Sequence, residues 1–153
     1  MSRNPTMNQT HFRKLEKMYL DANIQKFLFE TTTVKVGKGQ AKIGLTISEK
    51  YYHALDAMHG AVYFKLLDDA AFFAVNSMVD DVFVLTTSFN INLIRPVSKG
   101  TIKAIGKLRF ASKKLFIADA TLYNEEGKEI AFGTGQFTKS RIQLTEGIGY
   151  RMS

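Results

Sequence analysis

The sequence predicts an α+β domain in which one curled antiparallel sheet wraps around a single long buried helix. Six segments alternate apolar and polar residues and are joined by short turns, which favours antiparallel neighbours. The stretch 60–79 is apolar on most of its circumference and contains no proline, as expected of a helix buried inside a domain. A chain of 153 residues with 45% hydrophobic residues can bury both elements in one core.

Residues 1–28 are predicted to form an N-terminal helical segment. Their apolar residues recur at helical spacing, with Thr10 placed to cap a helix and Asn23 placed to end it. These apolar residues are Phe12, Leu15, Met18, Tyr19 and Ala22. The main domain is expected over residues 29–140, and the tail 141–153 lacks a clear period and is expected at the surface or frayed.

The main domain is predicted to contain a hairpin, a loop, the long helix and four further strands. Residues 32–36 and 41–47 alternate on either side of a glycine-rich turn, and residues 48–58 read as a loop that leads to the helix. The four later strands are expected at 82–94, 101–110, 115–123 and 129–138. No internal repeat interrupts this order.

Composition excludes several classes of protein. Cysteine is absent, which excludes disulfide scaffolds, thiol nucleophiles and iron–sulfur clusters. No apolar run is long enough to span a membrane, and the first ten residues lack the apolar core of a signal peptide, so a cytoplasmic location is expected. The net charge is +7, and residues 95–114 hold the whole excess because this stretch contains seven basic residues and no acidic one.

Asp68 occupies an unusual position on the predicted helix. Five of its six neighbours at three, four and seven residues are apolar, and a carboxylate there is costly unless it is paired or used. A structural interpretation pairs Asp68 with Lys65 one turn earlier. Asp69, by contrast, lies four residues after Lys65 and is adequately explained by that ion pair.

The same helix begins at His59-Gly60, which gives Asp68 a chemical context. A helix start presents unpaired N–H groups and a positive dipole end, both suited to an oxygen that gains negative charge. Gly60 would allow a substrate to approach this backbone closely. The two features would form one site if a neighbouring subunit or a facing strand brought them together.

These residues resemble the hotdog-fold acyl-CoA thioesterases of the phenylacetate-pathway type. The run from His59-Gly60-Ala61 to Asp68 looks like the family signature of His-Gly-Gly, seven residues and Asp. The likeness continues through Asn92-Leu93-Ile94-Arg95-Pro96, Gly100 and the hairpin 124–131, and it covers roughly residues 29–138. The resemblance implies a hotdog fold and thioester hydrolysis.

The resemblance also implies roles for individual residues. Asp68 matches the catalytic carboxylate, which acts as general base or as nucleophile, and Gly60 matches the residue whose amide polarises the thioester carbonyl. His59 matches the motif histidine that shapes the turn. Thr86 matches a Ser/Thr position near the nucleophilic water, with Thr87 as the alternative if the register shifts by one residue.

Two positions depart from the family pattern. His53 stands where the family usually has an Asn that orients water or the carbonyl, and Ala61 stands in place of the second motif glycine. A histidine could make a similar hydrogen bond, but it titrates near neutral pH. A non-catalytic module that binds or senses acyl-CoA is therefore an alternative to the thioesterase, and a hotdog dehydratase or hydratase is a third, less favoured reading.

The basic stretch and the phenylalanines suggest how coenzyme A and an acyl group could bind. Ser112, Lys113, Lys114 and Arg109 are candidates for contacts with the coenzyme's phosphates, the alternative being a solvated strand face. Nucleic acid is disfavoured because Phe110 is expected on the apolar face of its strand. Phe64 and Phe72, with Phe73, line either an acyl pocket or simply the core.

The sequence as a whole predicts a hydrolase that cleaves acyl-CoA or aryl-CoA thioesters. No cofactor is expected beyond the coenzyme of the substrate, and no metal, because the spacing of His53, Asp56 and His59 fits no standard site. Neither a membrane nor a nucleic acid is an expected partner. Since an isolated curled sheet leaves open edges, a homodimer or a dimer of dimers is expected.

Overall fold

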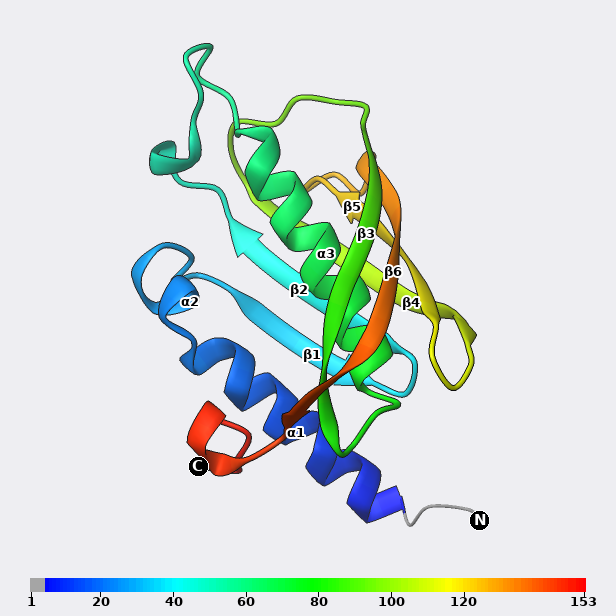
Figure 1. Ribbon diagram of the computed structural model, residues 1–153. Helices are drawn as coiled ribbons and strands as arrows, with labels where there is room; N and C mark the ends of the chain where they lie inside the picture. The colour runs from blue at the N-terminus through cyan, green and yellow to red at the C-terminus, as the bar shows by residue number, and fades with distance from the viewer. Residues whose placement is uncertain (1–4) are drawn as a thin grey trace.

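The computed structural model describes residues 5–153 and shows one curled sheet around one long helix (Figure 1). The helices are α1 (Pro5–Asp21), α2 (Asn23–Phe27) and α3 (Gly60–Asn76), with 3-10 turns at Glu49–Tyr51 and Glu146–Ile148. The strands are β1 (Thr33–Gly37), β2 (Gln40–Thr46), β3 (Val82–Leu93), β4 (Thr101–Ala111), β5 (Phe116–Tyr123) and β6 (Glu129–Gln143).

The sheet is antiparallel throughout and has the order β1-β2-β4-β5-β6-β3. Its concave face wraps α3, whose central residues Leu66, Leu67, Ala70 and Ala71 are completely buried. Gly106 of β4 lies directly against the helix, since a Cβ there would come within 2.1 Å of the Ala70 carbonyl oxygen. The predicted α+β class and the hotdog arrangement are confirmed.

The two edges of the sheet differ. The β1 edge is covered by α1, where Arg13 Nη2 donates to the Val36 carbonyl at 2.7 Å and the Val36 N–H donates to Glu16 Oε2 at 2.7 Å. These side chains occupy the backbone groups that another strand would need. The opposite edge is β3, which pairs only with β6 among the described residues. The sheet can therefore be extended at β3.

The element boundaries agree with the sequence prediction except near the two termini. α1 already includes Pro5, so Thr10 lies inside the helix and does not cap it. A proline suits the first helical position because it has no N–H to leave unpaired. β6 continues to Gln143, and the residues after it pack on α1, so the tail is at the surface but is not frayed.

Two of the register shifts in the sheet are β-bulges that change which side chains share a face. One lies between Thr86 and Ser88 of β3, and the other between Leu108 and Phe110 of β4. An extra residue in one strand reverses the inward and outward alternation beyond it. Phe110 therefore faces outward with Lys107 and is 49% exposed, which makes the prediction that it lies on the apolar face wrong.

Candidate active site

Asp68 and Thr86 form the central contact of the candidate site. Asp68 lies half-buried on α3, and the Thr86 hydroxyl on β3 donates to its Oδ1 at 2.8 Å. Lys65 does not pair with Asp68. Its Nζ lies 2.7 Å from Oδ2 of Asp69, as predicted for that pair. The structural interpretation of Asp68 as an ion-pair partner of Lys65 is therefore wrong.

The surroundings of Asp68 favour its protonated form. Burial raises the pKa of Asp68 from its ordinary value of 3.8 to about 6, and the negative charge of Asp69 acts in the same direction. The hydrogen bond from Thr86 and the positive charge of Lys65 both oppose this increase in pKa. A carboxylate with a pKa near neutrality can accept a proton during a reaction and return it.

The bulge in β3 places Thr86 beside Asp68. Val84 and Thr86 face the helix before the bulge, and Phe89 faces it afterwards, where its ring lies 5.6 Å from that of Phe64. An unbulged strand could not direct both Thr86 and Phe89 toward α3. Thr87 is the extra residue, and its hydroxyl donates to the Gln136 carbonyl instead. The structure therefore puts Thr86, and not the alternative Thr87, beside Asp68.

A polar cluster next to Asp68 attaches the N-terminal helices to α3. Lys65 Nζ donates to Gln25 Oε1 at 2.8 Å and to Asp69, and the Tyr19 hydroxyl donates to Asp69 Oδ2 at 2.7 Å. The same ammonium lies 4.5 Å from the centre of the Phe29 ring. The sequence placed Tyr19 only on an apolar face and did not identify Gln25. Gln25 lies forty residues from Lys65, and no local sequence pattern predicts a contact over that separation.

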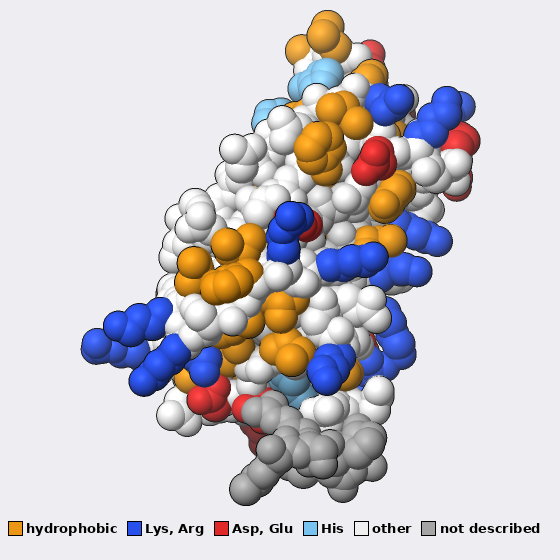
Figure 2. All heavy atoms as spheres, turned by 90° about the vertical axis from the view of Figure 1, so that its right-hand side faces the viewer, with side chains coloured by type: hydrophobic (Ala, Val, Ile, Leu, Met, Phe, Trp, Pro, Cys, Tyr) orange, Lys and Arg blue, Asp and Glu red, His pale blue; other side chains and the backbone are white. Residues whose placement is uncertain are grey.

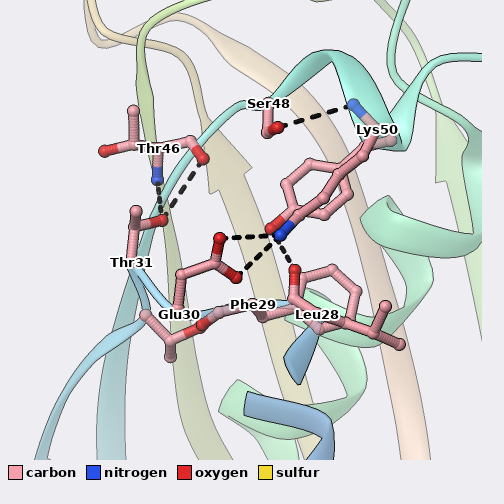
Figure 3. Close-up of polar contacts among 9 residues, drawn as sticks. Leu28, Phe29, Glu30, Thr31, Thr46, Ser48 and Lys50 are labelled. Atoms are coloured by element: carbon pink, nitrogen blue, oxygen red, sulfur yellow. Dashed lines mark hydrogen bonds and ion pairs between the residues drawn. The ribbon is translucent and has the colours of Figure 1, made fainter. Parts of the chain in front are cut away.

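Residues 28–31, which follow α2, are also held in place, by contacts with the end of β2 and with the loop that leads to α3 (Figure 3). Lys50 Nζ lies 2.7 Å from the Glu30 carboxylate, and the Tyr51 hydroxyl donates to the Leu28 carbonyl at 2.6 Å. The Thr46 N–H donates to the Thr31 hydroxyl at 3.1 Å. These contacts and the Lys65 cluster fix α2 from two sides.

Asp68 and Thr86 open into a cavity of about 920 Å³. Apolar residues of α3 and β3 line it next to Asp68, and α1, α2 and the C-terminal residues complete the wall. The apolar lining from α3 and β3 is Phe72, Phe73, Phe83 and Leu85. Phe72 was predicted at this place, whereas Phe64 is not among the lining residues and lies 41% exposed against Phe89.

The start of α3 presents the Gly60 amide. His59 is the N-cap, and its Nδ1 accepts a hydrogen bond from the Ala61 N–H at 2.9 Å. The Val62 N–H is bonded to the His59 carbonyl. Because an N-terminal residue has no acceptor within its helix, the Gly60 N–H remains able to bind an incoming oxygen.

Gly60 and Asp68 of one chain are too far apart to act on the same carbonyl. They are eight residues apart on one helix, which corresponds to about 12 Å along its axis. Gly60, Phe64 and Asp68 lie four residues apart on the face of α3 that contacts β3. A Cβ at Gly60 would lie 3.3 Å from Leu93 Cδ1, Phe64 meets Phe89, and Asp68 meets Thr86.

His53 lies in the loop before α3 and not beside Asp68 in the same chain. Its Nδ1 accepts a hydrogen bond from the Leu55 N–H at 3.0 Å. Within residues 5–153, no three His, Asp or Glu side chains are grouped in a way that could hold a metal ion. None of the helices in the same range is long and apolar enough to cross a membrane.

The predicted phosphate-binding residues lie around the turn between β4 and β5. Ser112, Lys113 and Lys114 are exposed in this turn, and the Ser112 hydroxyl donates to the Leu115 carbonyl. Arg109 is 72% exposed but donates to Asp119 Oδ2 at 2.9 Å, an ion pair that a phosphate would have to compete with. Figure 2 shows groups of Lys and Arg side chains with hydrophobic patches between them on one side of the molecule.

The chain is similar in sequence to a known family and to a known protein. The family model of the Thioesterase superfamily matches residues 55–131, about half of the chain. The chain is 24% identical over 116 residues to a protein of Saccharolobus solfataricus named as an esterase, covering 72% of this chain and 77% of that protein.

Two solved structures show the same fold. The PaaI protein from the phenylacetic acid degradation operon of E. coli matches with a TM-score of 0.80 at 21% identity, covering 90% of this chain and 99% of that one. A point mutant of the phenylacetic acid degradation protein PaaI of Thermus thermophilus matches with a TM-score of 0.69 at 19% identity, covering 78% of this chain and 100% of that one.

Proposed function

Since the chain belongs to the Thioesterase superfamily, we propose that it hydrolyses acyl-CoA or aryl-CoA thioesters to a carboxylic acid and free coenzyme A. The observation that carries this proposal is the half-buried Asp68, which accepts a hydrogen bond from Thr86 at the wall of a cavity whose lining beside it, from α3 and β3, is mainly apolar. A carboxylate of raised pKa beside an apolar pocket suits the activation of water next to an acyl group.

In the proposed reaction Asp68 takes a proton from a water molecule whose oxygen attacks the thioester carbon. The carbonyl oxygen gains negative charge and accepts a hydrogen bond from a Gly60 N–H at the positive end of α3. The carbon–sulfur bond then breaks, and the proton held by Asp68 passes to the departing thiolate. Direct attack by Asp68 would form an anhydride, which water then hydrolyses to the same products.

We place each site between two copies of the chain. The 12 Å or so between Gly60 and Asp68 requires the amide and the carboxylate to come from different copies. If two β3 edges pair antiparallel about a two-fold axis at Asn90, Phe89 of one copy lies opposite Ile91 of the other. With Thr87 as the extra residue of the bulge, Leu93 of one copy then lies opposite Thr86 of the other. Leu93 lies beside Gly60, and Thr86 lies beside Asp68. This pairing therefore brings the Gly60 amide of one copy close to Asp68 of the other, at two equivalent sites.

The turn between β4 and β5 is proposed to hold the phosphates of the coenzyme. Ala111, Phe116, Phe137 and Thr86 form one row across β4, β5, β6 and β3. Three strand spacings separate its ends, so the turn is about 14 Å from Thr86. An extended coenzyme arm would bridge this distance, with Lys113 and Lys114 at the phosphates.

A module that binds acyl-CoA without hydrolysing it is the second candidate. It is favoured by His53, whose Nδ1 is already engaged by the Leu55 N–H where the family usually has an Asn. Release of thiol from a panel of short, long and aryl acyl-CoAs separates the two candidates.

Asp68→Asn tests the proposed role of the carboxylate. The variant should lose thiol release by about a hundredfold or more, while Asp81→Asn, which changes an exposed carboxylate outside the cavity, serves as the matched control. Binding of acyl-CoA without thiol release by the parent would favour the binding module. Unchanged thiol release by Asp68→Asn would remove Asp68 from the mechanism.

A further inference from the structure

The cavity beside Asp68 is closed on one side by the end of the chain. Residues 144–151, called here the C-terminal strap, follow β6 and return to lie along α1 (Figure 1). Five residues of the strap line the same cavity as Asp68 and Thr86. They are Glu146, Gly147, Ile148, Gly149 and Arg151. The strap is therefore part of the candidate site.

The strap is held along one face of α1. The Tyr150 hydroxyl lies 2.6 Å from His11 Nδ1, and its ring lies 5.3 Å from Lys14 Nζ. One helical turn further on, Gly149 rests against Met18, and Arg151 Nη2 lies 3.6 Å from Asp21 Oδ2. These residues of α1 recur at intervals of three and four, the spacing of one helix face.

Gly149 allows the strap to turn where it meets Met18 of α1. Its φ is +93°, a left-handed conformation that residues with a side chain rarely adopt. A Cβ at this position would make an ordinary van der Waals contact with the Met18 Cα, at 3.4 Å, so the backbone conformation and not a lack of space favours glycine. The opposite end of the strap is fixed by the Leu144 N–H, which donates to the Asp81 carbonyl at 3.0 Å. Both ends of the strap are thus attached to the rest of the molecule.

Ile148 is the only apolar side chain that the strap contributes to the cavity. The apolar lining of α3 and β3 begins beside Asp68 with Phe72, Phe83 and Leu85, and Met18 of α1 adds to it. An apolar acyl group attached to a thioester at Asp68 would follow this lining, because burying each methylene is favourable. The other strap side chains that line the cavity, Glu146 and Arg151, are charged, and an apolar group would avoid them.

We propose that the C-terminal strap forms the end of the acyl pocket and that Ile148 limits the length of the apolar acyl group accepted there. This inference rests on the proposed function, since it assumes that the cavity beside Asp68 holds the acyl group of a thioester. The substrates it specifies are apolar acyl-CoAs whose far end reaches the strap, and Ile148 acts in specificity and not in the chemical step.

The test compares Ile148→Ala with Ile148→Trp. Binding of hydrolysis-resistant S-alkyl-CoA thioethers, from ethyl to hexadecyl, is measured by calorimetry for the parent and for each variant. The smaller side chain should tighten binding of the longest bound thioether relative to the shortest by about tenfold, and the larger side chain should weaken it by a similar factor. Ile148 is 39% exposed, so neither substitution disturbs the core. Met152→Ala, at an exposed residue outside the cavity lining, is the matched control.

The outcomes separate this inference from the proposed function. Opposite shifts in length preference for the two Ile148 variants, with none in Met152→Ala, support the strap as the end of the pocket. The same preference in all proteins, shifts in one direction for both variants, or no binding of any thioether would overturn it. The proposed function is judged instead by thiol release from acyl-CoA, which the thioethers do not require.

Discussion

The Thr86 hydroxyl donates a 2.8 Å hydrogen bond to Oδ1 of Asp68 and so joins the edge strand β3 to the central helix. This contact stabilises the charged form of a carboxylate that its burial disfavours. The balance between the two effects sets the pH at which Asp68 can accept a proton.

Thr86→Val should move the acidic limb of the activity profile to higher pH. The variant keeps the branched shape but loses the O–H donor, and a hydrogen bond to a charged group is worth enough to raise the pKa of Asp68 by about one unit when it is lost. In the parent, kcat/KM should fall as the pH drops below about 6, where Asp68 becomes protonated. Thr86→Ser keeps the donor and should stay close to the parent, whereas a limb unmoved in Thr86→Val would contradict the role of this bond.

Asp68→Asn should stabilise the fold at neutral pH while abolishing activity. The folded protein raises the pKa of Asp68 from 3.8 to about 6, so folding takes up a proton between these values and the stability of the parent increases as the pH falls through this window. Above it the charged Asp68 costs about 1–3 kcal/mol, a cost that the neutral amide does not carry.

Urea unfolding at pH 7.5 and pH 3.5 measures this difference. Asp68→Asn should exceed the parent in free energy of unfolding at the higher pH and match it at the lower one. Asp81→Asn, at an exposed carboxylate, should differ from the parent by less than about 0.5 kcal/mol at pH 7.5. An equal or smaller stability of Asp68→Asn at pH 7.5 would mean that the buried carboxylate is not under strain.

The double variant Lys113→Ala/Lys114→Ala should raise KM for an acyl-CoA more than for the corresponding acyl-pantetheine, which lacks the nucleotide phosphates. Two exposed lysines at a phosphate would account for an increase of about tenfold in KM. Lys128→Ala, in the exposed turn between β5 and β6, removes a positive charge at the opposite end of the sheet and is the control. Equal effects on both substrates would assign the two lysines to a solvated surface.

The sequence was sufficient for the fold and for the placement of Asp68, because both depend on periodicity. Alternation located the strands, and the helical wheel placed Asp68 among apolar neighbours and Asp69 beside Lys65. Periodicity fails where one residue is added to a strand. The bulge at Thr87 is the reason why the sequence could not decide between Thr86 and Thr87 as the partner of Asp68, and the bulge before Phe110 is the reason why that ring was predicted on the wrong face.

Contacts between distant parts of the chain could not be predicted at all. Tyr150 meets His11 across almost the whole chain, and nothing in the sequence around either residue reveals the contact. The proposed site shared between two copies differs in this respect, because the helical spacing between Gly60 and Asp68 can be read from the sequence and already suggests a second copy.

Mixed dimers test most directly whether Gly60 of one copy works with Asp68 of another. Gly60→Pro removes the N–H at the first position of α3, where proline is tolerated, and His59 already has the φ of −64° and ψ of 143° that suit a residue before proline. Gly60→Ala adds a Cβ but keeps the N–H, so it should retain more activity than Gly60→Pro. Each of Gly60→Pro and Asp68→Asn should be inactive alone.

When the two inactive variants are unfolded together in equal amounts and refolded, half of the dimers contain both chains, and each of these has one intact site. Thiol release should then recover to about one quarter of the parent's rate. Recovery to that level is the predicted result. No recovery, with mixed dimers demonstrated by mass spectrometry, would contradict a site shared between Asp68 and the Gly60 amide of a second copy.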